Sequence, residues 1–125
     1  MIRLTKNQII NMHSLLITKT GGSPGIRDEG LLSSALNAPY QPFGGNDLYE
    51  TIHQKAAKLC YFLIKDHPFT DGNKRIGVLS MIVFLEINGI EVSCTDSDLV
   101  KLGFGLASGS ISDEDLLNWL LDCSQ

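Results

Sequence analysis

The stretch from Ile76 to Ile87 constrains the fold more than any other part of the chain, because it is apolar on nearly every side. Only Gly77, Ser80 and Glu86 interrupt its apolar character. A helix that is hydrophobic all round has no face to present to water, so other elements must cover it. We therefore predict a helix that runs through the centre of the fold and stops at Asn88-Gly89.

The segments around that stretch have the spacing of amphipathic helices and their stop signals. In chain order these predicted helices are residues 5–18, a short helix from Asp28 to before Pro39, residues 47–66 with an apolar core stripe from Leu48 to Leu63, a helix from Thr95 or Asp96 to before Ser108, and one opened by a capping box of Ser112 and Asp115. Residues 39–46 predict a loop or irregular flap, and residues 91–94 can form one short strand. We predict a single all-α domain over residues 1–125, a compact bundle of about six helices around one buried helix.

Composition excludes several classes of protein. The formal net charge of -4 leaves no overall positive field, so we expect no direct nucleic-acid binding and no attraction to an anionic membrane. The longest mainly apolar run has about half of the roughly 20 residues that a membrane-spanning helix needs. The N-terminus lacks the cleavage site of a signal peptide. Three cysteines without a CxxC pair predict neither a disulfide framework nor a thiolate zinc site, so we expect a cytoplasmic protein with reduced thiols.

The nine residues from His67 to Arg75, HPFTDGNKR, place an imidazole, a carboxylate, an amide and two cations between two predicted helices. Ordinary connecting loops do not have this composition. Pro68 pushes the residue before it out of the α region, so the preceding helix must end near Asp66 and His67 must lie on a loop. Histidine titrates near neutral pH, which suits His67 to act as general base on an incoming hydroxyl.

The start of the next helix predicts a phosphate site. A loop that turns at Gly72 and enters a helix at Asn73 leaves backbone N–H groups unpaired at the positive end of the helix dipole. We expect the amides of Gly72, Asn73 and Lys74 to bind phosphate, and the side chains of Lys74 and Arg75 to stabilise negative charge. Asp71 repels such an anion unless a divalent cation lies between them, so we expect Asp71 to hold Mg²⁺. Together these groups indicate phosphoryl-type transfer from a nucleotide.

Each of these residues taken alone also has a structural interpretation. Asp71-Gly72 is a turn signal, and Asn73 is a common helix cap. The isolated histidines His13 and His53 we expect to be structural or solvated. We interpret Phe69 as an anchor that buries the loop against the core.

The stretch HPFTDGNKR resembles the signature loop of the Fic/Doc family, whose Fic branch reads HPFx(D/E)GNGRxxR. Seven positions agree, namely His67, Pro68, Phe69, Asp71, Gly72, Asn73 and Arg75. Upstream, GIRDEGLLSSAL from Gly25 to Leu36 resembles the segment that opens small Doc-type toxins. The resemblance implies a Fic-like helical bundle with a short flap, and a transferase that uses ATP and Mg²⁺.

Two departures from the Fic branch favour the Doc branch. Lys74 replaces the second glycine of the motif, and Val78 occupies the place of its last arginine. Both missing residues serve AMP transfer in Fic adenylyltransferases, so the resemblance implies the Doc arrangement, in which ATP presents its γ-phosphoryl group to a target hydroxyl. By the same resemblance the target is a threonine of translation elongation factor Tu, translation is arrested, and a Phd-type antitoxin neutralises the toxin.

The resemblance also bears on substrate docking and inhibition. Residues 40–46 resemble in position the flap on which Fic-type enzymes dock an extended target peptide. Some Fic proteins carry an inhibitory helix with the pattern (S/T)xxxE(G/N). Ser110 and Glu114 have its spacing, but Asp115 occupies its last place. We therefore expect inhibition by a separate chain whose C-terminal segment folds as a helix across the site.

Three other functions stay open on the sequence. The loop also permits AMP transfer to the target. A catalytically silent module that binds a partner is a second alternative. A metal phosphohydrolase with His67 and Asp71 as i, i+4 ligands is the third, and it is disfavoured because Pro68 and Gly72 break the helix that such spacing requires.

Overall fold

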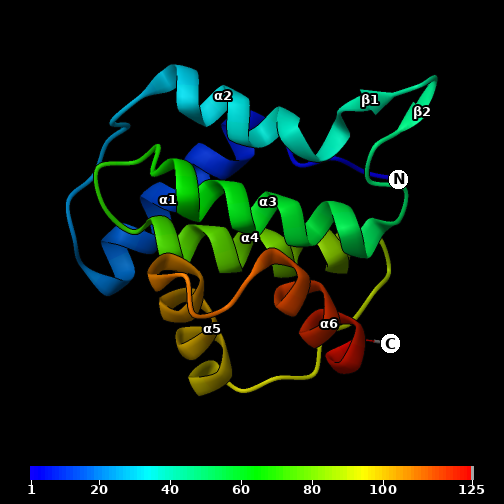
Figure 1. Cartoon of the computed structure of the whole chain (residues 1–125). Coiled ribbons are helices and arrows are strands. Elements are labelled where there is room, and N and C mark those ends of the chain that lie inside the picture. Colours follow the sequence, from blue (N-terminus) through cyan, green and yellow to red (C-terminus); the bar gives the residue numbers. More distant parts are fainter. Residues whose placement is uncertain (125) are drawn as a thin grey trace.

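The computed structural model describes residues 1–124 as six α-helices, one 3₁₀ helix and a two-stranded hairpin. Figure 1 shows these elements, which in chain order are α1 (Lys6–Thr20), α2 (Glu29–Asn37), η1 (Ala38–Tyr40), β1 (Pro42–Phe43), β2 (Asn46–Asp47), α3 (Ile52–Asp66), α4 (Asn73–Ile87), α5 (Asp96–Ser108) and α6 (Asp113–Cys123). The predicted all-α fold of about six helices is confirmed.

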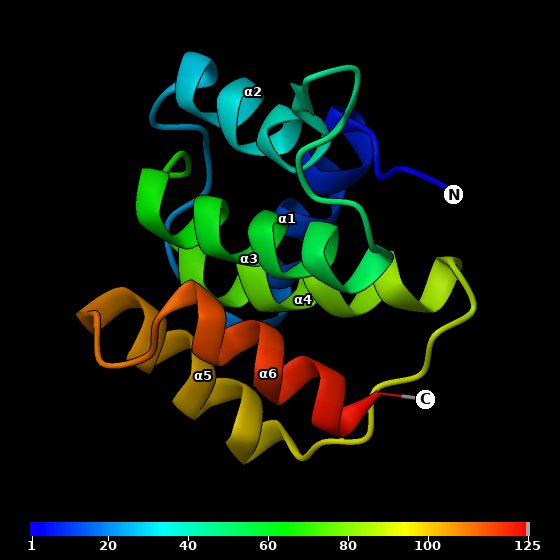
Figure 2. The ribbon, with the colours of Figure 1, turned by 45° about the vertical axis from the view of Figure 1, so that its right-hand side comes forward.

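The helix predicted to be buried, α4, lies at the centre of the bundle. Ile76, Met81, Phe84 and Leu85 on this helix are fully buried. Helix α4 packs along α3, while α1 and α5 also contact α4 and α2 and α6 cover α3 (Figures 1 and 2). A Cβ built on Gly77 would lie 2.9 Å from Ile64 Cγ1, so this glycine permits the close approach of α3 and α4. The apolar run is therefore central because three helices, α1, α3 and α5, pack against it.

Helix α3 starts later than predicted. Thr51 caps it at Ile52, since the Thr51 side chain accepts from the backbone N–H of Gln54 and the Gln54 side chain accepts from the Thr51 N–H. The residues before Thr51 lie outside the helix. Leu48, which was predicted to belong to the apolar core stripe, is 41% exposed. The predicted start at residue 47 and the burial of Leu48 are both wrong, because a strong cap lies inside the apolar repeat.

Residues 42–47 form a hairpin, in which Pro42 pairs with Asp47 and Phe43 with Asn46. Two glycines with positive φ make its turn, as a two-residue hairpin loop requires. The hairpin is held from below by Lys55, a buried residue of α3 whose Nζ lies 3.2 Å from Asp47 Oδ2. The segment between α2 and α3, predicted as a loop or irregular flap, is thus a regular hairpin.

The hairpin and His67 lie at different ends of α3. The hairpin adjoins the N-terminal end of α3, whereas His67 follows its C-terminal end (Figure 1). A helix of 15 residues is about 22 Å long. The hairpin and His67 therefore lie at opposite ends of α3, and the docking of a target peptide on residues 40–46 stays a prediction.

The C-terminal part of the chain returns to the loop between α4 and α5. Val92 pairs with Ser124 in an isolated bridge, and the N–H of Ser93 donates to the carbonyl of Cys123 at 2.7 Å. The strand expected at residues 91–94 is therefore reduced to this bridge. The capping box of Ser112 and Asp115 opens α6 as predicted.

Within residues 1–124, every helix is too short or too polar to cross a membrane.

Ser80 provides a test of packing at the centre of α4. Its side chain is fully buried, and its Oγ has no hydrogen-bond partner within the described chain. An unpaired buried hydroxyl is costly, so Ser80→Ala should leave the free energy of unfolding unchanged or raise it by up to about 1 kcal/mol. Urea unfolding measures this change.

Asn73→Ala is the contrasting variant, because the Asn73 side chain is equally inaccessible but hydrogen-bonded. It should lower the free energy of unfolding by about 1–3 kcal/mol. A comparable loss in Ser80→Ala would show that Ser80 contributes a hydrogen bond after all.

Candidate functional site

His67 lies where α3 ends, as the following proline predicted. Its backbone is left-handed, with φ 53° and ψ 52°, and it is the one residue other than glycine with a positive φ among residues 1–124. Its side chain is exposed and lines a cavity. The imidazole is therefore accessible to a substrate.

The loop after His67 is held by buried groups. The N–H of Phe69 donates to Asn73 Oδ1, and Asn73 Nδ2 donates to the carbonyl of Phe69, both at 2.9 Å. The Phe69 ring is 1% exposed and stacks on His13, with the ring centroids 3.8 Å apart. The interpretation of Phe69 as an anchor is confirmed, and the Asn73 side chain shapes the loop.

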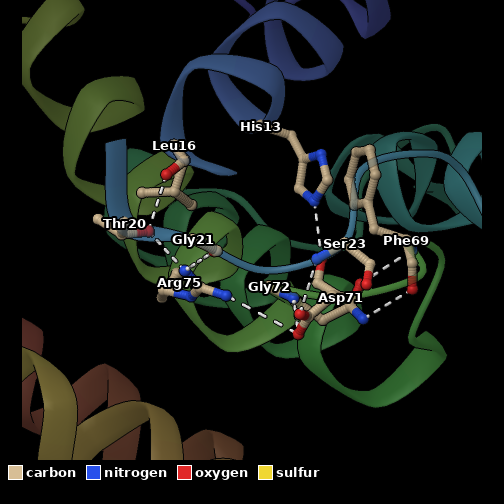
Figure 3. A network of polar contacts seen from close by, with 10 residues as sticks. His13, Leu16, Thr20, Gly21, Ser23, Phe69, Asp71, Gly72 and Arg75 are labelled. Carbon is tan, nitrogen blue, oxygen red and sulfur yellow. Dashed lines mark hydrogen bonds and ion pairs between the residues drawn. The ribbon is translucent and has the colours of Figure 1, made fainter. Parts of the chain in front are cut away.

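His13 completes this support from α1, as Figure 3 shows. Its Nε2 lies 2.7 Å from the carbonyl oxygen of Asp71. A carbonyl can only accept, so Nε2 carries the proton and donates. The structural interpretation of His13 is thus confirmed. That of His53 is too, because its Nε2 pairs with Ser124 Oγ at 2.8 Å.

The Asp71 carboxylate accepts two backbone hydrogen bonds. The N–H of Ser23 donates to Oδ2 at 3.1 Å, and the N–H of Gly72 donates to Oδ1 at 2.8 Å. These two bonds, Ser23 first, and the nearby Arg75 charge hold the pKa of Asp71 below its ordinary value. Asp71 is therefore ionised at neutral pH. The stability that its ionised form contributes is complete above the ordinary carboxyl pKa and is lost as the pH falls through the lowered one.

Arg75 ties the loop to the end of α1. Its Nη1 donates to Thr20 Oγ1 and to the carbonyl of Gly21, the latter at 2.8 Å, and its Nη2 lies 3.8 Å from Asp71 Oδ1 (Figure 3). The guanidinium thus links Asp71 to α1 while it also lines the cavity. The sequence predicted that Arg75 binds phosphate and stabilises negative charge, but not this tie.

Helix α4 opens toward the cavity without a side-chain cap. Gly72 is its N-cap, with φ 77°, and its N–H is taken by Asp71. The amides of Asn73 and Lys74 have no hydrogen-bond partner in the described part of the chain. They are free donors of the first turn and remain predicted phosphate ligands, whereas the Gly72 amide, predicted with them, is already bonded to Asp71.

One cavity of about 960 Å³ collects the predicted site residues. Its polar wall includes His67, Asp71, Gly72, Asn73, Lys74 and Arg75, and also Thr20, Lys65 and Asp96. Its apolar wall comes mainly from α4 and α5 and includes Leu79, Ile82, Leu99 and Phe104. The Lys74 ammonium lies 5.0 Å from the centre of the Phe104 ring, at the junction of the two walls. The volume lies in the range of small-ligand sites.

Asp71 fits Mg²⁺ as one ligand of a shared site. Within residues 1–124 no group of three or more His, Cys, Asp or Glu side chains can hold a metal ion. Mg²⁺ commonly binds through one or two carboxylates, with substrate phosphates and water completing its shell. An ionised carboxylate has about four acceptor positions, and backbone amides use two of those of Asp71. Asp71 therefore has capacity left for a cation that a nucleotide phosphate also binds.

The segment between α1 and α2 is the part of the site that sequence reasoning missed. Gly21 and Gly22 follow Thr20, and from the sequence alone two consecutive glycines indicate only the end of a helix. A Cβ built on Gly22 would lie 2.6 Å from Asp71 Oδ2, so only glycine allows this segment to approach the carboxylate. The consecutive glycines were the available signal, but nothing in their spacing pointed to Asp71.

Comparison with known proteins adds three findings. The model of the Fic/DOC family matches residues 3–85, which include the whole of the loop from His67 to Arg75. The chain is 38% identical over 73 residues to Toxin Doc of Mycolicibacterium smegmatis, covering 58% of this chain and 56% of that protein, so it matches just over half the length of this relative. It is 28% identical over 112 residues to Protein kinase doc of Escherichia phage P1, covering 90% and 87%.

Gly22 and Gly21 offer a matched test of the contact with Asp71. Both have positive φ, but a Cβ on Gly21 meets nothing within 4 Å. Alanine strains the backbone at either position, and at Gly22 it also collides with the carboxylate. Gly22→Ala should therefore lower the free energy of unfolding by about 1–2 kcal/mol more than Gly21→Ala.

The same pair in an Asp71→Ala background isolates the contact. The extra cost of Gly22→Ala over Gly21→Ala should shrink by at least about half, because the closest atom, Asp71 Oδ2, is gone and only Arg75 Nη2 and Ile17 Cδ1, both 3.1 Å from the added Cβ, still crowd it. Urea unfolding of the four variants measures it. If the difference between Gly22→Ala and Gly21→Ala is as large without Asp71 as with it, the contact with the carboxylate is not what requires glycine at position 22.

Proposed function

The chain belongs to the Fic/Doc family, and we propose that it is a Doc-like toxin that transfers the γ-phosphoryl group of ATP to a serine or threonine hydroxyl of a target protein. One observation carries the proposal. An exposed His67 and an uncapped helix start bearing Lys74 in place of the Fic glycine face the same cavity. The relatives named as a toxin and as a protein kinase support the same reading.

ATP binds in the cavity of about 960 Å³ in this proposal. The apolar wall of α4 and α5 receives the base. The amides of Asn73 and Lys74 bind the phosphates at the positive end of the α4 dipole. Asp71 holds Mg²⁺, which neutralises charge on the phosphate oxygens when it is bound. The Lys74 side chain is exposed, and its ammonium lies over the Phe104 ring. To reach the nucleotide, the ammonium moves away from that ring.

His67 acts as the general base. It takes the proton of the acceptor hydroxyl as the oxygen attacks the γ-phosphorus, and the bond from that phosphorus to the β-phosphate oxygen breaks to release ADP. Lys74 stabilises the charge that develops on the transferred group. Arg75 adds positive charge and, through its bonds to Thr20 and Gly21, keeps Asp71 facing the cavity.

The partners in this proposal follow the Doc resemblance. The target is a threonine of elongation factor Tu, whose modification arrests translation in the cytoplasm. A Phd-like antitoxin supplies the inhibitor. Its segment can cover the apolar wall of the cavity, where the Phe104 ring is 61% exposed and Val100 is also exposed. The three free cysteines agree with a reducing compartment.

The position of the label in ATP decides the reaction. With purified protein, Mg²⁺ and elongation factor Tu or cell extract, γ-labelled ATP should label the target and α-labelled ATP should not. Label from the α position would establish AMP transfer instead. His67→Ala should lower the rate by a factor of roughly 10²–10⁴.

His53→Ala is the matched control, because His53 lies on the first turn of α3 and bonds to Ser124. It should keep the activity. In cells without an antitoxin, His67→Ala should abolish growth arrest. Growth arrest that survives His67→Ala would support the silent binding module and contradict the enzyme.

A substitution of Lys74 tests whether this residue selects γ-phosphoryl transfer over AMP transfer. Lys74→Gly restores the glycine of the Fic motif and enlarges the space at the helix start, so it should lower γ-phosphoryl transfer at least about tenfold and permit detectable AMP transfer. Lys101→Gly, on the exposed surface of α5, controls for the loss of a lysine from a helix. An unchanged product pattern would remove Lys74 as the determinant.

A further inference from the structure

The C-terminal end of α3 is closed by a side chain from a distant segment. The last carbonyls of a helix have no partner within it, and the backbone N–H groups that follow usually close them. Here the residue after His67 is Pro68, which has no N–H to donate. Arg27 replaces it. Its Nε lies 2.6 Å from the carbonyl oxygen of His67, and its Nη2 lies 3.0 Å from that of Asp66.

The backbone around Arg27 is itself fixed against the loop. The N–H groups of Arg27 and Asp28 both donate to the carbonyl of Pro68, at 2.8 and 3.0 Å. Ile26 pairs with Phe69 in an antiparallel bridge, and the N–H of Thr70 donates to the carbonyl of Gly25 at 3.1 Å. Asp28 then caps α2. The guanidinium therefore projects from a rigid base onto the last turn of α3.

This contact acts on the one strained residue of the site. A left-handed backbone is unfavourable for a residue with a Cβ, and it persists only where the surroundings hold it. The direction of the His67 side chain depends on that backbone. The positive charge of Arg27 also lies at the negative end of the α3 dipole. Arg27 does not line the cavity, so it reaches the reacting groups only through His67.

We propose that Arg27 is a positioning residue for His67, which holds the imidazole in its productive direction by bonding the carbonyls of Asp66 and His67. This inference rests on the proposed function for its kinetic consequence. Its structural consequence, that the conformation of His67 depends on Arg27, is independent of any activity.

The kinetic experiment compares Arg27→Gln with Arg3→Gln, which also removes one arginine charge but from a side chain that stacks on Tyr40. Arg27→Gln should lower kcat for phosphoryl transfer about 10–100-fold, with KM for ATP within about threefold, because a small displacement of a base is costly while the phosphate site is intact. Arg27→Lys, which can reach one carbonyl, should fall between Arg27→Gln and the natural protein. Arg3→Gln should leave kcat unchanged.

A His67→Ala background separates positioning from general structural damage. If Arg27 acts through the imidazole, Arg27→Gln should leave the residual rate of His67→Ala unchanged within about twofold. A further drop of the full size would overturn the inference, and so would a natural kcat in folded Arg27→Gln. Should Arg27→Gln fail to fold, Arg27→Lys carries the same comparison.

An NMR experiment on histidine-labelled protein keeps the inference apart from the proposed function. In Arg27→Gln the backbone Cα signal of His67 should shift, whereas that of His53 should not. If His67→Ala keeps full activity, the proposed function fails, and the NMR result still decides the role of Arg27. An unmoved His67 signal overturns the inference whatever the activity.

Discussion

The exchange of hydrogen bonds between the Asn73 side chain and the backbone of Phe69 is the contact on which the rest of the site depends. Both residues are buried, so the amide must be paired, and the Phe69 backbone is the partner that this loop offers. The exchange sets the shape of the turn between α3 and α4. It therefore directs the first amides of α4 toward the cavity and leaves His67 exposed at its edge.

The charged residues of the site serve its architecture as well as its chemistry. Asp71 and Arg75 join the start of α4 to the end of α1, and Arg27 joins the start of α2 to the end of α3. Each tie crosses between segments that are distant in the chain. These ties hold the loop and its neighbours in place, which in the proposed reaction lowers the cost of ordering the site.

The helices and the chemistry-bearing loop could be predicted, whereas contacts between segments could not. The apolar run of α4 and the proline after His67 act through local sterics and burial, and both predictions are confirmed. The start of α3 was wrong because the cap at Thr51 outweighed an apolar repeat that continues upstream. The hairpin lies in the segment predicted as a loop or flap, but its distance from His67 is set by the length of α3 and could not be predicted from residues 39–46.

The sequence by itself determined the helical class, the central position of α4 and the group of residues that carry the proposed reaction, because periodicity, capping and proline geometry are properties of neighbouring residues. Tertiary structure alone decided that Gly22 approaches Asp71 and that Arg27 closes α3. Those contacts join residues about 40 to 50 positions apart, and no local pattern encodes which distant carbonyl or carboxylate a backbone N–H or a guanidinium will meet.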